Sequence, residues 1–338
     1  MKRILALILA LLCLPLVSCS SGLEPVEETA PAENAQQTQK KTEDKKEDVT
    51  EEKIFENPKE DGKMNILLIG NSYSYYWCDE LYGMLAAAGY EDAKIYNVYY
   101  SGCKLYQHWN WLVNKESNYQ LFCNDKSGRR GESDVGMDYC LSRQNWDIIS
   151  FQQSGSYVYG ANGSEENLRN SISEHLPLLY KYIHDRFPMA QYYWLQSWVH
   201  EIGDGSKGLN TLEEQTAITS WHRNVAKEVC PRYGFTRVPC GDAWEAVRHN
   251  PIIKANGYTL TTRVQKGKQI DDLSHDGDMG GGQYLNACVW FEKILGQSCV
   301  GNTFRPQYTL DGKDVSLSEE KIALLQNAAH EAVLNMEK

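Results

Sequence analysis

The stretch Met64-Asn65-Ile66-Leu67-Leu68-Ile69-Gly70-Asn71-Ser72-Tyr73-Ser74 decides the fold that we predict. A short apolar run ends abruptly in Gly-Asn-Ser, and an aromatic segment of helical character follows. Strands buried in a parallel sheet read as continuous apolar runs, and ligands bind just beyond the carboxyl ends of such strands. Ser72 is therefore expected where a nucleophile would be presented, at a turn from strand to helix.

Strand-like and helix-like segments alternate along the rest of the chain. Further strands are predicted at residues 93–100, 146–151, 190–196 and 235–239. Helices are predicted at residues 75–88, 164–186, 212–230 and 283–295, with a last helix from Ser316 or Ser318. Residues 104–145 read as a short helix, a long loop and a helical piece near 135–143, and residues 250–270 as an irregular excursion. This alternation predicts an α/β fold of three layers, α/β/α, with a flavodoxin-like parallel sheet of about five strands.

The first 19 residues have the pattern of an export signal. Lys2-Arg3 precedes a short apolar run, and Leu16-Val17-Ser18-Cys19 resembles a bacterial lipoprotein box in which Cys19 becomes the lipidated first residue. An ordinary signal peptide with a chance cysteine, or a short membrane anchor, are the alternatives. Pro15 interrupts the apolar run, which is shorter than the about 20 residues of a spanning helix. We expect an exported protein, lipid-anchored to the bacterial membrane and facing outside the cytoplasm.

Residues 20–62 are rich in acidic side chains and poor in large apolar ones, which is typical of a disordered tether. Residues 63–338 are long enough for one α/β domain with a sizeable core. The formal net charge of the whole chain is −11, and no basic stripe is visible in the domain. A nucleic-acid partner is therefore not expected.

The cysteines give no sign of a metal site. Eight remain after Cys13 and Cys19 are set aside, and they include no Cys-x-x-Cys pair or Cys/His cluster at zinc spacing. We expect neither a metal nor a cofactor. In an exported chain some thiols could oxidise, and a Cys123–Cys140 bridge would close a polar loop.

A nucleophilic serine needs a base, a group that orients the base, and donors for the oxyanion. Asp272-Leu273-Ser274-His275 has a spacing that lets the carboxylate reach back to the imidazole Nδ1–H and leaves Nε2 facing the serine. A solvated acidic turn is one alternative. A calcium loop is another, although its regular acidic spacing and closing Glu are absent.

Three short blocks together resemble the SGNH (GDSL-type) hydrolases, in their carbohydrate-esterase-like branch. Gly70-Asn71-Ser72 resembles the Gly-Asp-Ser block, Ser101-Gly102 the second-block glycine, and Asp272-x-x-His275 the last block. Their order and spacing agree with the family over roughly residues 63–300. The resemblance implies the SGNH hydrolase fold, with Ser72, Asp272 and His275 as catalytic residues. It also implies an oxyanion hole that includes the backbone N–H groups of Ser72 and Gly102.

The sequence departs from the family pattern at two places. Asn71 replaces the usual Asp, and Phe151-Gln152-Gln153-Ser154 stands where Gly-x-Asn-Asp is usual. We expect Gln152 or Gln153 to supply the carboxamide donor of the oxyanion hole, the alternative being that both bond loop backbone. A lipase-type Gly-x-Ser-x-Gly elbow is absent, which argues against the ordinary α/β-hydrolases.

Aromatic side chains gather near the predicted strand ends, and the chain has 21 Tyr but only 7 Phe. Rings with a polar tip suit stacking on sugars, although we expect about half of them, including Trp77 and Trp194, to lie in the core. The sequence predicts a serine esterase that removes acetyl (short acyl) groups from carbohydrate through an acyl-enzyme on Ser72. Two alternatives remain open: a non-catalytic glycan-binding surface lipoprotein, and an acyl thioesterase or lipase of the same fold.

Overall fold

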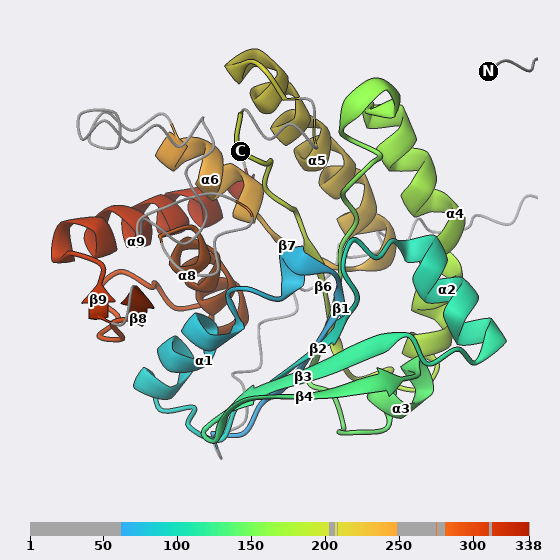
Figure 1. Cartoon of the computed structure of the whole chain (residues 1–338), viewed down its shortest axis with the longest axis horizontal. Helices are drawn as coiled ribbons and strands as arrows, with labels where there is room; N and C mark the ends of the chain where they lie inside the picture. Colours follow the sequence, from blue (N-terminus) through green and yellow to red (C-terminus); the bar gives the residue numbers. More distant parts are fainter. Residues whose placement is uncertain are drawn as a thin grey trace, which may run out of the picture. The chain divides into compact units, whose positions relative to one another are not determined.

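Two layers of helices enclose one seven-stranded sheet in the computed structural model of this protein (Figure 1). The structure describes residues 62–202, 207, 209–248, 275, 281–310 and 313–337, all within one compact unit, Lys53–Lys338. The predicted export signal, Cys19, most of the predicted tether and residues 250–270 lie outside the described residues. The α/β/α prediction is confirmed.

The five predicted strands lie side by side and run parallel. In the sheet, β1 (Asn65–Gly70) lies between β2 (Lys94–Tyr99) and β5 (Ile148–Phe151). Next to β5 follow β6 (Gln191–Leu195) and β7 (Thr236–Val238). The carboxyl ends of all five strands therefore meet at one edge of the sheet.

An antiparallel hairpin extends this sheet beyond β2 and corrects the prediction of a long loop. It consists of β3 (Tyr119–Asp125) and β4 (Gly128–Val135), and β3 pairs antiparallel with β2. The sheet is consequently mixed and has seven strands rather than about five parallel ones, in the order β4-β3-β2-β1-β5-β6-β7. Most of β4 is exposed, so its charged and glycine-bearing sequence lacks the hydrophobic alternation by which strands are recognised.

In the described part of the chain, four helices pack against each face of the sheet. Figure 1 shows them as two layers with the sheet between them. One layer contains α1 (Cys78–Ala87), α6 (Cys240–Arg248), α8 (Gly281–Leu295) and α9 (Glu319–Leu334). The other contains α2 (Leu105–Asn114), α3 (Met137–Leu141), α4 (Glu165–His184) and α5 (Leu212–Tyr233). The sequence analysis did not predict α6 or the small hairpin of β8 (Gln307–Leu310) and β9 (Lys313–Ser316).

The central strand supplies side chains to both hydrophobic layers. In β1, Ile66 and Leu68 pack toward α1 and α8, whereas Leu67 and Ile69 pack toward α2 and α4. Alternation of this kind is the reason why a strand covered on both faces is apolar throughout. Trp77 and Trp194 are buried, which confirms that part of the aromatic residues belongs to the core. In the described residues, the helices are all too short or too polar to cross a membrane.

Side-chain caps fix where the long helices start. Ser164 caps α4 by accepting a hydrogen bond from the Asn167 N–H. Thr211 and Glu214 form a reciprocal capping box at the start of α5. Gly234 ends α5 in the left-handed conformation, at φ 67°, so that β7 can begin. Such local signals explain why these helices were predicted almost at their observed bounds.

Candidate active site

Ser72 lies at the carboxyl end of β1, in the first turn after the strand. The chain leaves β1 at Gly70 and forms a short 3-10 helix, η1 (Ser72–Ser74), which Asn71 caps by accepting the Tyr73 N–H. The Ser72 side chain is partly exposed, whereas its neighbours Asn71 and Tyr73 are buried. A turn of this kind presents one hydroxyl at the sheet edge and holds its flanking residues in the core.

His275 lies directly against this hydroxyl. The Oγ atom of Ser72 and the Nε2 atom of His275 are 2.8 Å apart, although 203 residues separate the two in the chain. The His275 side chain is buried, with 2% of its surface exposed. The distance is that of a hydrogen bond, so the imidazole is placed to take the hydroxyl proton.

The predicted acid of the triad, Asp272, lies outside the described residues. A different carboxylate reaches His275 from the end of β6. Glu201 Oε2 accepts a hydrogen bond from the backbone N–H of His275 at 3.1 Å, and Glu201 is 2% exposed. The sequence analysis did not identify this acidic residue, which lies in the loop after β6.

Asn71 joins the ends of the first two strands. Its Nδ2 donates to the carbonyl oxygen of Cys103 at 2.8 Å, while its Oδ1 accepts the Tyr73 N–H at 3.1 Å. An aspartate could accept the second bond but could not donate the first. The departure from Gly-Asp-Ser therefore has a structural role: the amide ties the Ser72 turn to the loop that contains Gly102.

Two backbone N–H groups near Ser72 are available as oxyanion donors. Gly102 has a φ of +65°, a conformation in which a residue other than glycine would be strained. Within the described part of the chain, the backbone N–H groups of Ser72 and Gly102 donate to no backbone carbonyl. Backbone donors of this kind are what an oxyanion hole requires.

The two glutamines after β5 differ in their surroundings. Gln153 is engaged: its Oε1 accepts the Leu105 N–H at 3.3 Å, and its Nε2 donates to Ser171 Oγ at 3.1 Å. Gln152 is buried, and neither atom of its carboxamide has a hydrogen-bond partner among the described residues. A Cβ atom on Gly70 would lie 2.5 Å from Ser74 Oγ and 2.8 Å from Gln152 Nε2, so a larger residue at position 70 would displace these side chains. Of the two glutamines, Gln152 is thus the one whose carboxamide has no partner among the described residues.

Aromatic rings surround the His275 imidazole. The ring of His200 lies 4.0 Å from it between centroids, and that of Tyr73 lies 4.2 Å away. Trp198 and Tyr76 complete the group at 5.6 Å and 6.0 Å. Burial holds the pKa of the Tyr73 hydroxyl well above its ordinary value, so this residue stays neutral beside the base. These rings pack against His275 and contribute to its burial.

Burial keeps two other histidines of the described part of the chain uncharged at neutral pH. His108 and His222 are buried, and burial lowers the pKa of each imidazole, to about 3 and about 4 respectively. In the described ranges, no three His, Cys, Asp or Glu side chains come together as a metal site would require. All eight cysteines there are free and buried. The suggested Cys123–Cys140 bridge is not formed: Cys123 lies on β3 beside Arg130, whereas Cys140 belongs to α3 and is buried in the core.

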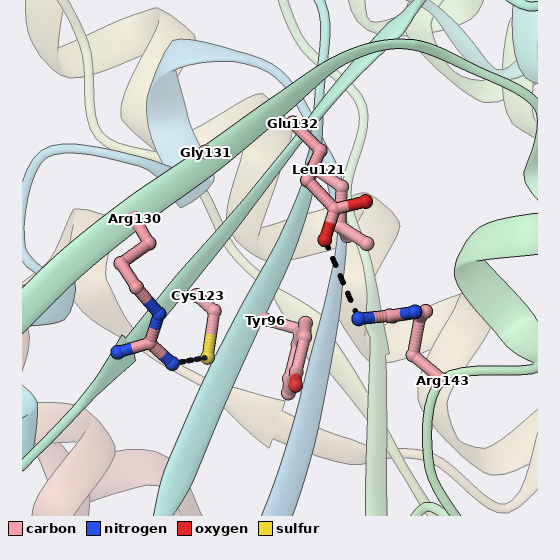
Figure 2. Close-up of a pocket in the computed structure, with 7 residues that line it drawn as sticks. All are labelled: Tyr96, Leu121, Cys123, Arg130, Gly131, Glu132 and Arg143. Carbon is pink, nitrogen blue, oxygen red and sulfur yellow. Dashed lines mark hydrogen bonds and ion pairs between the residues drawn. The ribbon is translucent and has the colours of Figure 1, made fainter. Parts of the chain in front are cut away.

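A small pocket of about 70 Å³ does not include Ser72 in its lining. Figure 2 shows the seven residues that line it. It is lined by residues of β2, β3 and β4 and by Arg143, and Tyr96 contributes from the middle of β2. Its guanidinium groups are engaged, since Arg130 is paired with Asp125 at 2.6 Å and Arg143 with Glu132 at 3.4 Å. We assign no chemistry to this pocket.

A larger cavity of about 470 Å³ lies beside Tyr159. Trp221, Lys207 and Glu214 are among its other lining residues. The Tyr159 hydroxyl is within 3.2 Å of the Tyr73 hydroxyl and accepts the His200 N–H at 3.0 Å. One aromatic side chain therefore separates this cavity from the residues around His275.

A family model described as "Domain of unknown function (DUF4886)" matches residues 65–332. The chain belongs to this family. The DUF4886 chain is similar to the crystal structure of a DUF4886 family protein from Bacteroides uniformis, with 23% identity and a TM-score of 0.64, over 82% of this chain and 96% of that one. This likeness shows a shared fold.

Two other solved structures resemble the DUF4886 chain more distantly. One is a GDSL-like lipase from Bacteroides thetaiotaomicron, at 11% identity and a TM-score of 0.39, over 70% of this chain and 89% of that one. The other is an acetylxylan esterase from Geobacillus stearothermophilus, at 11% identity and a TM-score of 0.42, over 68% and 94%. No curated protein matches the chain.

Proposed function

We propose that this DUF4886 protein is a serine esterase that removes acetyl or other short acyl groups from carbohydrate through an acyl-enzyme on Ser72. The observation that carries the proposal is the 2.8 Å contact between Ser72 Oγ and His275 Nε2 at the carboxyl edge of the sheet. A glycan-binding module has no need of a serine hydroxyl held against a buried imidazole. The contact thus favours the enzyme over the non-catalytic alternative.

Each atom of the site has a step to perform in this reaction. His275 Nε2 takes the hydroxyl proton as Ser72 Oγ attacks the ester carbonyl carbon. The oxyanion accepts hydrogen bonds from the N–H groups of Ser72 and Gly102 and from the Gln152 carboxamide. The protonated His275 then gives its proton to the sugar oxygen as the bond between that oxygen and the acyl carbon breaks, so the sugar leaves as an alcohol and the acyl group stays on Ser72. Water, activated by His275, releases that group as the free acid.

Aromatic side chains near Ser72 support a sugar as the leaving group. Tyr75, Tyr76 and Tyr99 are partly exposed, with Tyr75 lying 4.8 Å from Tyr99 and 5.3 Å from Tyr76 between ring centroids. Partly exposed rings with polar tips can stack on a sugar ring and bond its hydroxyls.

The nucleophile is tested by comparing the parent enzyme with Ser72→Ala. We expect the parent to react with a fluorophosphonate probe and to hydrolyse 4-nitrophenyl acetate, and Ser72→Ala to do neither while keeping its circular dichroism spectrum. A parent protein that neither reacts nor hydrolyses would support the glycan-binding alternative. Nitrophenyl esters of increasing chain length test the acyl preference, since activity that peaks at long chains would contradict the short-acyl proposal.

We also propose that the enzyme is exported and held at the membrane by a lipid on Cys19. The basic start, the apolar run and Leu16-Val17-Ser18-Cys19 support this location. Cys19→Ala should move the protein from the membrane fraction to the soluble fraction. A parent protein that is already soluble would contradict the lipid anchor.

A further inference from the structure

Glu201 is a buried carboxylate that the mechanism above leaves unused. Its side chain is 2% exposed, and its Oε2 accepts the backbone N–H of His275 at 3.1 Å. Removing a carboxylate from water is costly unless nearby charges or hydrogen bonds compensate. A carboxylate in this position would be favoured by the positive charge that forms on His275 during the reaction.

The chain segment that presents Glu201 is held rigidly by three buried side chains. Arg248 of α6 donates to the carbonyl oxygen of Val199 at 2.9 Å. The Tyr159 hydroxyl accepts the N–H of His200 at 3.0 Å, and Gln215 of α5 donates to the carbonyl oxygen of His200 at 2.6 Å. The backbone just before Glu201 is therefore bonded on both sides, and the carboxylate has little freedom to move.

The negative charge of Glu201 is felt across the site. Burial is the main cause of the raised pKa of Tyr73 and of Tyr159, and the charge of Glu201 raises both further. Burial lowers the pKa of the Arg248 guanidinium, and the charge of Glu201 opposes this effect. Tyr73 lies 4.2 Å from the His275 ring between centroids, so a charge that reaches Tyr73 also reaches the imidazole.

We propose that Glu201 is a positioning residue for the base: its carboxylate fixes His275 against Ser72 and stabilises the imidazolium that forms during acyl transfer. This inference rests on the proposed function and adds a second acid to the one that the SGNH resemblance implies, Asp272. Glu201 acts through His275 and touches no substrate. It comes from the end of β6, far in sequence from the Asp-x-x-His block.

The test uses the pH dependence of kcat/KM for 4-nitrophenyl acetate. His275 must be neutral to act as base, and the Glu201 charge favours its protonated form. In Glu201→Gln, which keeps an acceptor for the His275 N–H but loses the charge, we expect the acidic limb to move to lower pH by about one unit. We also expect kcat to fall about tenfold or more, with less change in KM, because general base catalysis is weakened.

Other titratable groups face the His275 ring and must be considered. Among the described residues these are Tyr73 and Tyr76 from the segment after β1 and His200 and Glu201 from the loop after β6. The Arg248 guanidinium also interacts electrostatically with Glu201. Protonation of His200 would also alter the acidic limb, but Glu201→Gln would leave that contribution in place. A shift found in Glu201→Gln is therefore due to the carboxylate.

A matched control is available in α8. Glu292 is 5% exposed and accepts the backbone N–H of Cys299 at 2.7 Å, so it repeats the burial and bonding of Glu201 at a different place. Glu292→Gln should leave the pH profile of the parent unchanged, even if it lowers the melting temperature. Glu201→Asp, which keeps the charge on a shorter arm, should keep the acidic limb of the parent while kcat falls.

The inference is wrong if Glu201→Gln retains both the kcat and the acidic limb of the parent. If Glu201→Gln does not fold, Glu201→Asp still tests the inference. Glu201→Asp retains the charge, so an acidic limb of its pH profile that differs from the parent's would contradict the proposed effect of that charge. The failure of the proposed function would look different, since a parent activity that survives in Ser72→Ala would remove the nucleophile itself.

Discussion

Replacing Gln152 by methionine separates catalysis from folding at this site. Methionine has nearly the same length as glutamine but no N–H to donate. One oxyanion donor is worth about 3 kcal/mol of transition-state stabilisation, so kcat should fall by about 10²–10³. KM should change little, because the bond is made only when the oxyanion forms.

The two neighbouring glutamines should respond in opposite ways. The Gln152 carboxamide has no partner among the described residues, so Gln152→Met should leave the free energy of unfolding equal to that of the parent or slightly higher. Gln153→Met removes the acceptor of the Leu105 N–H and the donor to Ser171. An unpaired buried N–H costs about 1–3 kcal/mol, so this variant should be less stable but retain most of its kcat.

Initial rates with 4-nitrophenyl acetate and urea unfolding curves measure the two effects. A Gln152→Met enzyme with a kcat within about threefold of the parent would refute the reasoning, because an oxyanion donor is worth far more than that. If kcat falls about a hundredfold in Gln153→Met instead, the Gln153 carboxamide is the oxyanion donor. Its hydrogen bonds to Leu105 and Ser171 must then break during the reaction.

Two further predictions concern stability. Asn71→Asp should lower the free energy of unfolding by about 1–3 kcal/mol, because a carboxylate cannot donate to the Cys103 carbonyl. It should also reduce kcat, because the Ser72 turn is then no longer tied to the loop that contains Gly102. Urea unfolding curves and initial rates measure the two effects. Burial raises the pKa of Glu80 from 4.5 to about 7, so the folded state holds the proton more tightly than the unfolded state does. The stability that this provides, roughly 3 kcal/mol, is present below pH 4.5 and is lost as the pH rises to about 7. Urea unfolding curves recorded from pH 4.5 to 8 measure this loss of stability. Glu80→Gln should abolish the loss, whereas a loss that persists in the variant would show that another group causes it.

The sequence predicted those parts of the fold that depend on local patterns. The five parallel strands are each an apolar run covered on both faces, as in Ile66–Ile69, and such runs can be recognised in isolation. The β3–β4 hairpin could not be recognised, because β4 lies at the sheet edge and is held by backbone bonds to β3 rather than by buried side chains. Backbone pairing leaves no trace in the hydrophobic pattern.

For the candidate site, the sequence predicted the residue types but not their partners. Ser72 and His275 were predicted from their blocks, and the structure brings them within hydrogen-bond distance. Gln152 and Gln153 are identical in type and adjacent in sequence, and they differ only in the side of the strand end from which each side chain leaves. Glu201 was missed because its partner is a backbone N–H 74 residues away, for which no spacing rule exists.

The eight buried thiols of the described residues can be used to follow how this protein unfolds. They are spread over both sides of the sheet, for example in β3 at Cys123, in α5 at Cys230 and in α8 at Cys288. A thiol in the core reacts with an alkylating reagent only when its own segment opens. The native sequence thus carries a set of reporters, and their separate modification rates would show which layer separates from the sheet first.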